Sequence, residues 1–219
     1  MAAFFMPTTP WLNKCIWATL VLSMAGIVAV YLRQAVSTPP LPVLHPTGDF
    51  QLTNQLGHIV GKSSLIGHPT VVNVIFSRCP TQCHRLSQRM SQLQGKIGPE
   101  VQLLSLSADP GYDTPEVLTQ YGRKYDADST HWWFLTGTKA EIYRYATGDL
   151  LFTVLENPDP AHAKLEDLFI HSADFAILDG QARLRAVVHG EEPEALAQIV
   201  QVLNQLRPSS RCVSGITTK

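Results

Sequence analysis

Two cysteines, Cys79 and Cys83, lie four positions apart in the segment FSRCPTQCH, residues 76–84. If both lay in the first turns of one helix, their side chains would share a face, because residues i and i+4 are neighbours there. A helix N-terminus and the nearby Arg78 would favour thiolate over thiol. Two convergent thiolates suit a soft metal cation or a redox-active disulfide. The spacing leaves both uses open, beside the plainer one of two buried structural thiols.

The other two cysteines are poorly placed to join this pair. Cys15 lies in an apolar run, and Cys212 lies in a polar C-terminal segment. Four cysteines in a chain of 219 residues do not make a disulfide scaffold, so a redox or metal pair is the better interpretation. Among the eight histidines, His84 directly follows Cys83. Consecutive helical residues point about 100° apart, so we expect His84 to face solvent or the rim of a site.

The elements around the pair predict an α/β domain. Residues 71–76 form a nearly continuous apolar run of strand length, which is typical of a strand covered on both faces. Leu86, Met90 and Leu93 follow at helical spacing, which places the cysteine pair at a strand-to-helix junction. A second buried strand is predicted over residues 101–106.

Periodicity and turn signals predict the remaining elements. These are a hairpin over 50–60, a helix opened by Thr114 and Pro115, a helix over 139–145, a hairpin over 173–188 and an amphipathic helix over 196–206. The expected order is therefore β-hairpin, β, α, β, α, α, β-hairpin, α. An alternating start and an antiparallel finish predict a mixed sheet flanked by helices, which is a thioredoxin-like plan.

The N-terminal part of the chain predicts a membrane anchor. Residues 15–32 carry no charge and are bracketed by Lys14 and Arg33. A helix of this length spans about 27 Å, close to the hydrocarbon thickness of a bilayer. A cleaved signal peptide is the alternative, but the run exceeds a usual h-region and no convincing A-x-A site follows it. We therefore expect an uncleaved transmembrane helix over 15–32, after an N-terminal tail over 1–14.

Composition sets the domain boundaries and the compartment. The prolines of residues 33–48 predict an extended tether, followed by the folded domain over 49–207 and a disordered tail over 208–219. The net charge of −1, without a basic stripe, argues against nucleic acid as a partner. The N-terminus lacks the repeated arginines of a mitochondrial transit peptide. We expect a single-pass protein of the bacterial inner membrane, with its domain on the periplasmic side.

Four motifs extend the interpretation of the cysteine pair: FSRCPTQC, LSADPGYDTPEVL, WWFLTG and HSADFAILDGQARLR. In this order, over residues 49–206, they resemble the Sco/SenC family. That family consists of thioredoxin-fold copper chaperones needed to build the CuA centre of cytochrome c oxidase. The resemblance implies copper ligation by Cys79, Cys83 and His171, as Cu(I) with Cu(II) as a second state. It also implies that the partner is oxidase subunit II or a related copper recipient.

The donor set agrees with this implication. Two thiolates and one imidazole form a low-coordinate soft site suited to Cu(I), although zinc accepts the same donors. The sequence departs from the family at His84, where proline is usual, and at Ile170, where aspartate is frequent. The second change removes an acceptor that could orient the ligand histidine. Neither departure deletes a ligand.

Other conspicuous residues have structural interpretations. We expect Asp109 and Asp113, which flank Pro110 and Gly111, to serve turn and cap chemistry. Trp132 and Trp133 are expected to be one core and one surface residue. Tyr121 and Tyr125 form a helical stripe that is typical of a core face.

Three functions compete for the cysteine pair. The first is a metallochaperone, which is not an enzyme. The second is a thiol–disulfide oxidoreductase acting on the recipient's cysteines, with Cys79 attacking and Cys83 resolving. Such enzymes are expected to place a cis-proline opposite the dithiol, where residues 170–173 contain none. A peroxidase of peroxiredoxin type is a distant third, because Phe76 occupies the position where that family carries threonine or serine.

Overall fold

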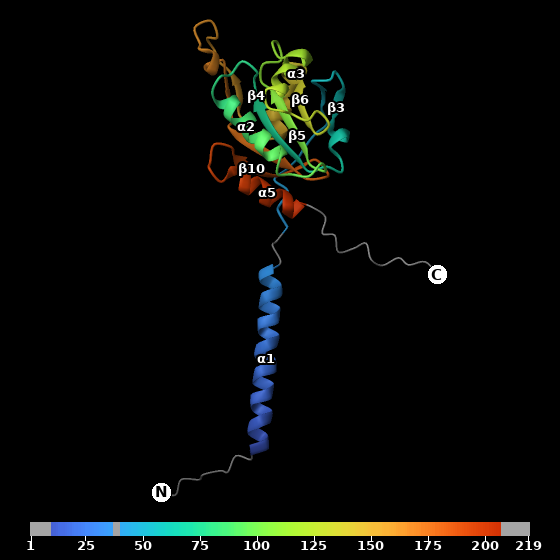
Figure 1. The fold of residues 1–219 in the computed structure, drawn as a ribbon, viewed down its shortest axis with the longest axis vertical. Helices are drawn as coiled ribbons and strands as arrows, with labels where there is room; N and C mark the ends of the chain where they lie inside the picture. The colour runs from blue at the N-terminus through green and yellow to red at the C-terminus, as the bar shows by residue number, and fades with distance from the viewer. Residues whose placement is uncertain (1–9, 37–39, 207–219) are drawn as a thin grey trace, which may run out of the picture. The chain divides into compact units, whose positions relative to one another are not determined.

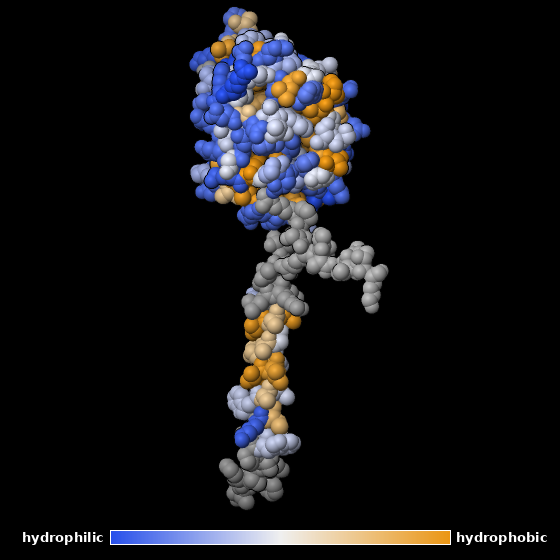
Figure 2. Space-filling view, turned by 45° about the vertical axis from the view of Figure 1, so that its right-hand side comes forward, coloured by the Kyte–Doolittle hydropathy of each residue, from blue (hydrophilic) through white to orange (hydrophobic). Residues whose placement is uncertain are grey.

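The structure is a computed structural model that describes residues 10–36 and 40–206. The chain divides into two units, Met1–Pro40 and Leu41–Lys219. The described part of the first unit is one helix, α1 (Pro10–Val36), which contains the predicted anchor. By length and composition, its stretch Lys14–Tyr31 is able to cross a membrane. Figure 2 shows hydrophobic side chains along this helix. Most of the predicted N-terminal tail and all of the predicted C-terminal tail lie outside the described residues.

The second unit is built on one mixed sheet of eight strands (Figure 1). In spatial order the strands are β1 (His45–Pro46), β10 (Arg183–His189), β9 (Asp174–Leu178), β4 (Thr70–Ile75), β5 (Gln102–Ser107), β6 (Trp132–Thr136), β2 (Gln51–Asn54) and β3 (Ile59–Gly61). The central strands β4, β5 and β6 are parallel, whereas every other neighbouring pair is antiparallel. The predicted mixed sheet is confirmed.

Helices flank this sheet. They are α2 (Gln82–Gln94), α3 (Pro115–Arg123), α4 (Lys139–Tyr143), which runs into a π-helical turn over Arg144–Asp149, and α5 (Ala195–Leu206). The helix α2 links β4 to β5, and α3 links β5 to β6. Both crossovers advance in the same direction across the sheet, so the right-handed rule places α2 and α3 on one face. The cap of α3 is as predicted, since the Thr114 hydroxyl accepts from the Val117 amide.

The sequence prediction missed two parts of the fold. Strand β6 contains the two tryptophans; Trp132 is fully buried, as expected for the core member of the pair, while Trp133 is half-buried rather than exposed. The second missed part is a two-stranded antiparallel sheet of β7 (Val154–Glu156) and β8 (Phe169–His171). We call β7, β8 and the loop between them the ribbon. Figure 1 shows the ribbon, in orange, projecting from the domain.

One polar residue interrupts the apolar run of β4. Asn73 is completely buried, and its side-chain oxygen accepts from the Ser105 hydroxyl at 2.8 Å. The same hydroxyl accepts from the Trp132 indole nitrogen at 3.1 Å. This chain of hydrogen bonds joins β4, β5 and β6 in the core, where unpaired polar groups would cost stability.

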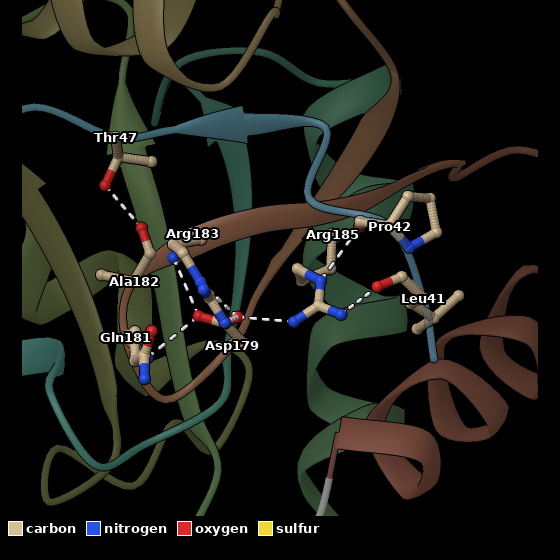
Figure 3. Close-up of polar contacts among 8 residues, drawn as sticks. All are labelled: Leu41, Pro42, Thr47, Asp179, Gln181, Ala182, Arg183 and Arg185. Atoms are coloured by element: carbon tan, nitrogen blue, oxygen red, sulfur yellow. Dashed lines mark hydrogen bonds and ion pairs between the residues drawn. The ribbon is translucent and has the colours of Figure 1, made fainter. Parts of the chain in front are cut away.

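Residues assigned to the tether belong partly to the sheet. The backbone of β1 pairs with β10, and the Thr47 hydroxyl donates to the Ala182 carbonyl (Figure 3). The Arg185 guanidinium donates to the backbone carbonyls of Leu41 and Pro42. Extended backbone with unused hydrogen-bonding groups can add to a sheet edge even where prolines are frequent. The folded unit therefore includes residues from Leu41 onward.

Asp179 organises the same region from the turn between β9 and β10. Its carboxylate accepts from the guanidinium groups of Arg183 and Arg185, each at 2.7 Å, and from the backbone amide of Gln181 (Figure 3). Burial alone would raise the pKa of this carboxyl, but the hydrogen bonds from Arg183 and Arg185 lower it to about 2. Asp179 is therefore ionised at neutral pH and orients Arg185 toward residues 41 and 42.

Candidate metal centre

The cysteines lie where the chain passes from β4 to α2. Cys79 precedes the helix, and its amide donates to the Phe76 carbonyl at 3.1 Å, while Cys83 lies in the first helical turn. The Phe76 amide in turn donates to Cys83 Sγ at 3.4 Å. The condition for a shared helix face, that both cysteines lie in the first turns of one helix, is therefore not met. A backbone turn at Cys79, closed on Phe76, brings the two side chains together.

Two aspartates hold this turn in place. The buried Asp113 carboxylate accepts from the backbone amide of Ser77 at 3.2 Å, from the Ser77 hydroxyl, and from the Ser107 hydroxyl at 2.6 Å. Burial raises the pKa of Asp113, while these hydrogen bonds oppose the rise. The Asp109 carboxylate accepts from Arg78 at 2.5 Å, and the Arg78 guanidinium stacks on Tyr112.

This support was missed by the sequence analysis. The two aspartates do form the predicted turn, since the amides of Tyr112 and Asp113 donate to the Asp109 carbonyl. Their side chains additionally bind the cysteine loop from a different segment of the chain. Only the motif LSADPGYDTPEVL as a whole signalled that these positions matter.

His171 approaches from the ribbon, as the last residue of β8. Its Nε2 lies 3.2 Å from Cys83 Sγ, and its Nδ1 lies 3.0 Å from the Ser172 carbonyl oxygen. A carbonyl oxygen can only accept, so Nδ1 carries the proton in this contact. The ring also packs edge-on against Phe76, with 6.0 Å between ring centroids. The Nε2 lone pair of the neutral ring is therefore directed at the cysteine pair.

The three side chains differ in protonation. The hydrogen bond from Cys83 lowers the pKa of Cys79 to about 5, against the effect of burial. Burial raises the pKa of Cys83 far above its usual range, and the neighbouring Cys79 adds to the rise. Burial also lowers the pKa of His171, which keeps the imidazole neutral at pH 7. The resting group is thus one thiolate, one thiol and one neutral imidazole.

The origin of the thiolate differs from the sequence interpretation. Arg78, expected to favour it, is bound to Asp109 instead. Cys83, in the first turn of α2, has a raised pKa, so burial outweighs the helix N-terminus at that sulfur. The thiolate on Cys79 depends mainly on its neighbour Cys83.

Cys83 contacts both of the other donors. Its thiol interacts with the Cys79 thiolate and lies against His171, and all three side chains are less than a tenth exposed. Across residues 10–36 and 40–206, no three Cys, His, Asp or Glu side chains surround a common centre as a finished metal site. The donors fit a soft cation chemically, because thiolate sulfur and imidazole nitrogen suit Cu(I). Closing the set around one cation requires movement of side chains and loss of the Cys83 proton.

His84, the competing histidine, points elsewhere. It is exposed, as predicted, with Nδ1 at 2.9 Å from the Tyr125 hydroxyl and Nε2 at 3.0 Å from the Gln88 amide nitrogen. Both ring nitrogens already have partners on the protein surface. Cys15 is exposed on α1, and Cys212 lies outside the described residues.

Comparison with known proteins gives this arrangement a family. Residues 42–206 match the SCO1/SenC family. This chain belongs to that family. The SCO1 protein homolog of Bacillus subtilis is 28% identical over 155 residues, which cover 69% of this chain and 77% of that protein. The resemblance seen in the sequence is confirmed.

Solved SCO1/SenC structures confirm the thioredoxin-like fold. BsSco, described as a member of the Sco family of cytochrome c oxidase assembly proteins with a disulfide switch, has a TM-score of 0.66 and 26% identity. That match covers 77% of this chain and 98% of BsSco. Copper-bound ScoI from Bradyrhizobium japonicum has a TM-score of 0.57 and 26% identity, covering 71% of this chain and 98% of ScoI.

Proposed function

We propose that this SCO1/SenC protein is a membrane-anchored copper metallochaperone that holds copper on Cys79, Cys83 and His171. The observation that carries the proposal is the direction of His171 Nε2, which faces Cys83 Sγ at 3.2 Å while Nδ1 is bound to a backbone carbonyl. The copper-bound relative from Bradyrhizobium japonicum supports copper as the cargo. The family's link to oxidase assembly supports subunit II of cytochrome c oxidase, at its CuA site, as the recipient.

Loading and release follow from the protonation of the donors. Cys79 is already a thiolate, whereas Cys83 must lose its proton as copper binds. Neutral His171 donates its Nε2 lone pair without prior deprotonation. Transfer is then ligand exchange, in which bonds to the recipient's donors form as bonds to these three residues break. Copper keeps its charge throughout the exchange. A disulfide between the cysteines would block loading, because copper binding needs free thiolates.

The oxidoreductase alternative uses the same cysteines but gives His171 no part. A nucleophilic Cys79 thiolate is compatible with both functions. A three-donor copper site requires the His171 imidazole beside the cysteines, whereas disulfide exchange does not need it as a ligand. We therefore favour the metallochaperone and treat disulfide exchange with the recipient as an outcome to be measured.

The anchor supports a location at a membrane. The apolar stretch of α1 is long enough to cross a bilayer. We propose a single-pass protein of the bacterial inner membrane with its copper-binding domain on the periplasmic side, where a CuA site would be assembled.

Competition for Cu(I) tests the proposal. The full-length protein in detergent micelles, with Cys15 and Cys212 replaced by serine, is reduced and titrated with Cu(I) against a chelator of known affinity. We expect one tight Cu(I) per chain. His171→Ala should weaken binding by at least about tenfold, or about 1.4 kcal/mol. His84→Ala is the matched control, since its ring nitrogens are bound to Tyr125 and Gln88; its affinity should stay within about twofold.

Two results would contradict the proposal. Weak Cu(I) binding by the reduced wild type would leave only a dithiol. Tight binding that ignores His171, or that depends equally on His84, would remove the three-donor site. In either case disulfide exchange with a CuA-type protein should be measured next.

A further inference from the structure

The loop of the ribbon, which joins β7 to β8, is organised at its base. The Asn157 amide donates to the Leu168 carbonyl at 2.9 Å, and the Asn157 side-chain amide donates to the Asp167 carbonyl at 2.9 Å. The Asp159 amide donates back to the Asn157 side-chain oxygen at 2.9 Å. The loop thus has a defined shape at its ends.

This loop carries a histidine in the orientation of a metal ligand. His162 Nδ1 lies 3.0 Å from both carboxylate oxygens of Asp159. The carboxylate accepts, so Nδ1 carries a proton in this contact, and in the neutral ring Nε2 is then the nitrogen that keeps a lone pair. Histidines that bind metals are usually oriented this way by a carboxylate on the other ring nitrogen. Within the ranges that the structure describes, Nε2 of His162 has no partner, and the side chain is 84% exposed.

His162 shares a pocket with the candidate copper site. The residues that line one open pocket of about 650 Å³ include His162, Asp159, Gln82, Ile170 and His171. The pocket reaches His171, whose own Nε2 touches Cys83. A second, largely exposed imidazole therefore lines the same opening as His171.

We propose that His162 is an exchange ligand for copper, which binds the ion transiently as it enters or leaves the site of Cys79, Cys83 and His171. This inference rests on the proposed function. In the step, a bond forms between His162 Nε2 and Cu(I) as the bond from copper to His171 or to an outside donor breaks. No electron is transferred, and no proton moves, because Asp159 keeps the proton on Nδ1. An added donor along the path lowers the barrier to ligand exchange without adding to affinity at equilibrium.

The chain offers a matched control in His189. Its Nδ1 lies 2.8 Å from the Asp174 carboxylate, and its side chain is 50% exposed. Asp174 is the first residue of β9, which runs antiparallel to β4. Asp174 and His189 therefore lie near the carboxyl end of β4, where the cysteine loop begins. His189 does not line the pocket. It therefore tests whether any exposed, carboxylate-bound histidine has the same effect.

The rate of copper transfer tests the inference. Full-length protein in micelles, with Cys15 and Cys212 replaced by serine, is loaded with one Cu(I) and mixed with excess bathocuproine disulfonate. His162→Gln should slow transfer by at least about fivefold while equilibrium affinity stays within threefold. Asp159→Asn should slow it less, and His189→Gln should leave the rate unchanged. Equal rates for His162→Gln and His189→Gln would overturn the inference.

A spectroscopic measurement separates direct binding from a change in loop structure. With one Ag(I) bound per chain, a second, sub-stoichiometric addition of Ag(I) should shift the ring nitrogen resonances of His162 before those of His189. Simultaneous shifts of both rings would reject a specific exchange ligand. Failure of the proposed function would look different, since Cu(I) binding would then be weak or indifferent to His171→Ala.

Discussion

The cysteines of the candidate site come from a loop fixed to the main sheet, whereas His171 comes from the ribbon outside it. The cysteine loop is bound to the buried Asp113, which also accepts from Ser107 of β5. The β7–β8 pairing is only three residues long. In its central pair, Leu155 and Ile170 are each more than half exposed. Few buried contacts and short pairing are properties of segments that open locally.

The difference suggests how one site can both retain and release a metal. The soft sulfur donors are held by the most buried polar network near the site. The imidazole is held by the short ribbon. Its base is closed by hydrogen bonds between Thr153, just before β7, and Ser172, just after β8. In the proposed copper site, movement of the ribbon first would remove one donor while two thiolates still hold the ion. The predictions below are ways to break or sharpen this contrast.

The largest expected effect is on affinity. In the background without Cys15 and Cys212, Cys79→Ser should lower Cu(I) affinity by about 1,000-fold or more, or about 4 kcal/mol. His171→Ala should cost about tenfold or somewhat more, since the thiolates supply most of the binding energy. Chelator competition measures both. Equal losses of affinity would mean that the cysteine loop and the ribbon contribute alike to copper binding.

The second prediction concerns stability. Asp113→Ala removes a buried carboxylate that accepts from Ser77 and Ser107, so the free energy of unfolding should fall by about 3 kcal/mol. Ser172→Ala removes the acceptor for the Thr153 amide at the base of the ribbon, and should cost about 1 kcal/mol or less. Urea unfolding of the full-length protein, followed by tryptophan fluorescence, compares the two. A greater loss of stability for Ser172→Ala would mean that the ribbon, not the cysteine loop, is the more firmly held part of the site.

Hydrogen exchange tests the contrast without mutation. Backbone amides of β8 should exchange about 100-fold faster than those of β4 in the copper-free protein. Loading with Cu(I) should slow exchange in β8 much more than in β4, because copper ties His171 to the cysteine loop. Mass spectrometry of peptic peptides reports both segments in one experiment. Equal exchange rates in β8 and β4 before loading would show that the ribbon does not open more readily than the main sheet.

The smallest expected effect is on the reactivity of Cys79. Its pKa of about 5 lies below the ordinary range for cysteine, so the thiolate predominates above pH 5 and is lost as the pH falls below it. The alkylation rate with iodoacetamide should therefore be nearly constant from pH 6 to 8. Cys83→Ala removes the hydrogen bond that lowers the pKa, and the rate at pH 6 should fall about tenfold. An unchanged rate would mean that another group stabilises the thiolate.

The same contrast explains how much the sequence could predict. The cysteine pair, β4 and α2 are adjacent in the chain, and the change from an apolar run to helical spacing identified all three. The strands β9 and β10 and the helix α5 were predicted for the same reason. These features depend on local patterns, which survive without knowledge of tertiary contacts.

Non-local features were not predictable in this way. Asp113 binds Ser77 across 36 positions of the chain, and no local pattern signals that contact. The ribbon was missed because its strands are three residues long, which is too short for a periodic signal. His171 was selected by the family resemblance rather than by its neighbours. Strand β6 was missed although it is apolar, because its tryptophans were considered only as single residues.

The segment of residues 41–48, which contains β1, has a consequence for handling this protein. Without residues 41–48, the first residues of β10 would lose their strand partner, and Arg185 would lose two backbone acceptors. An uncovered strand edge is a template for self-association between copies. A truncated domain that starts at Asp49, as the prolines alone suggested, would therefore be prone to aggregate, whereas one that starts at Leu41 keeps its edge covered.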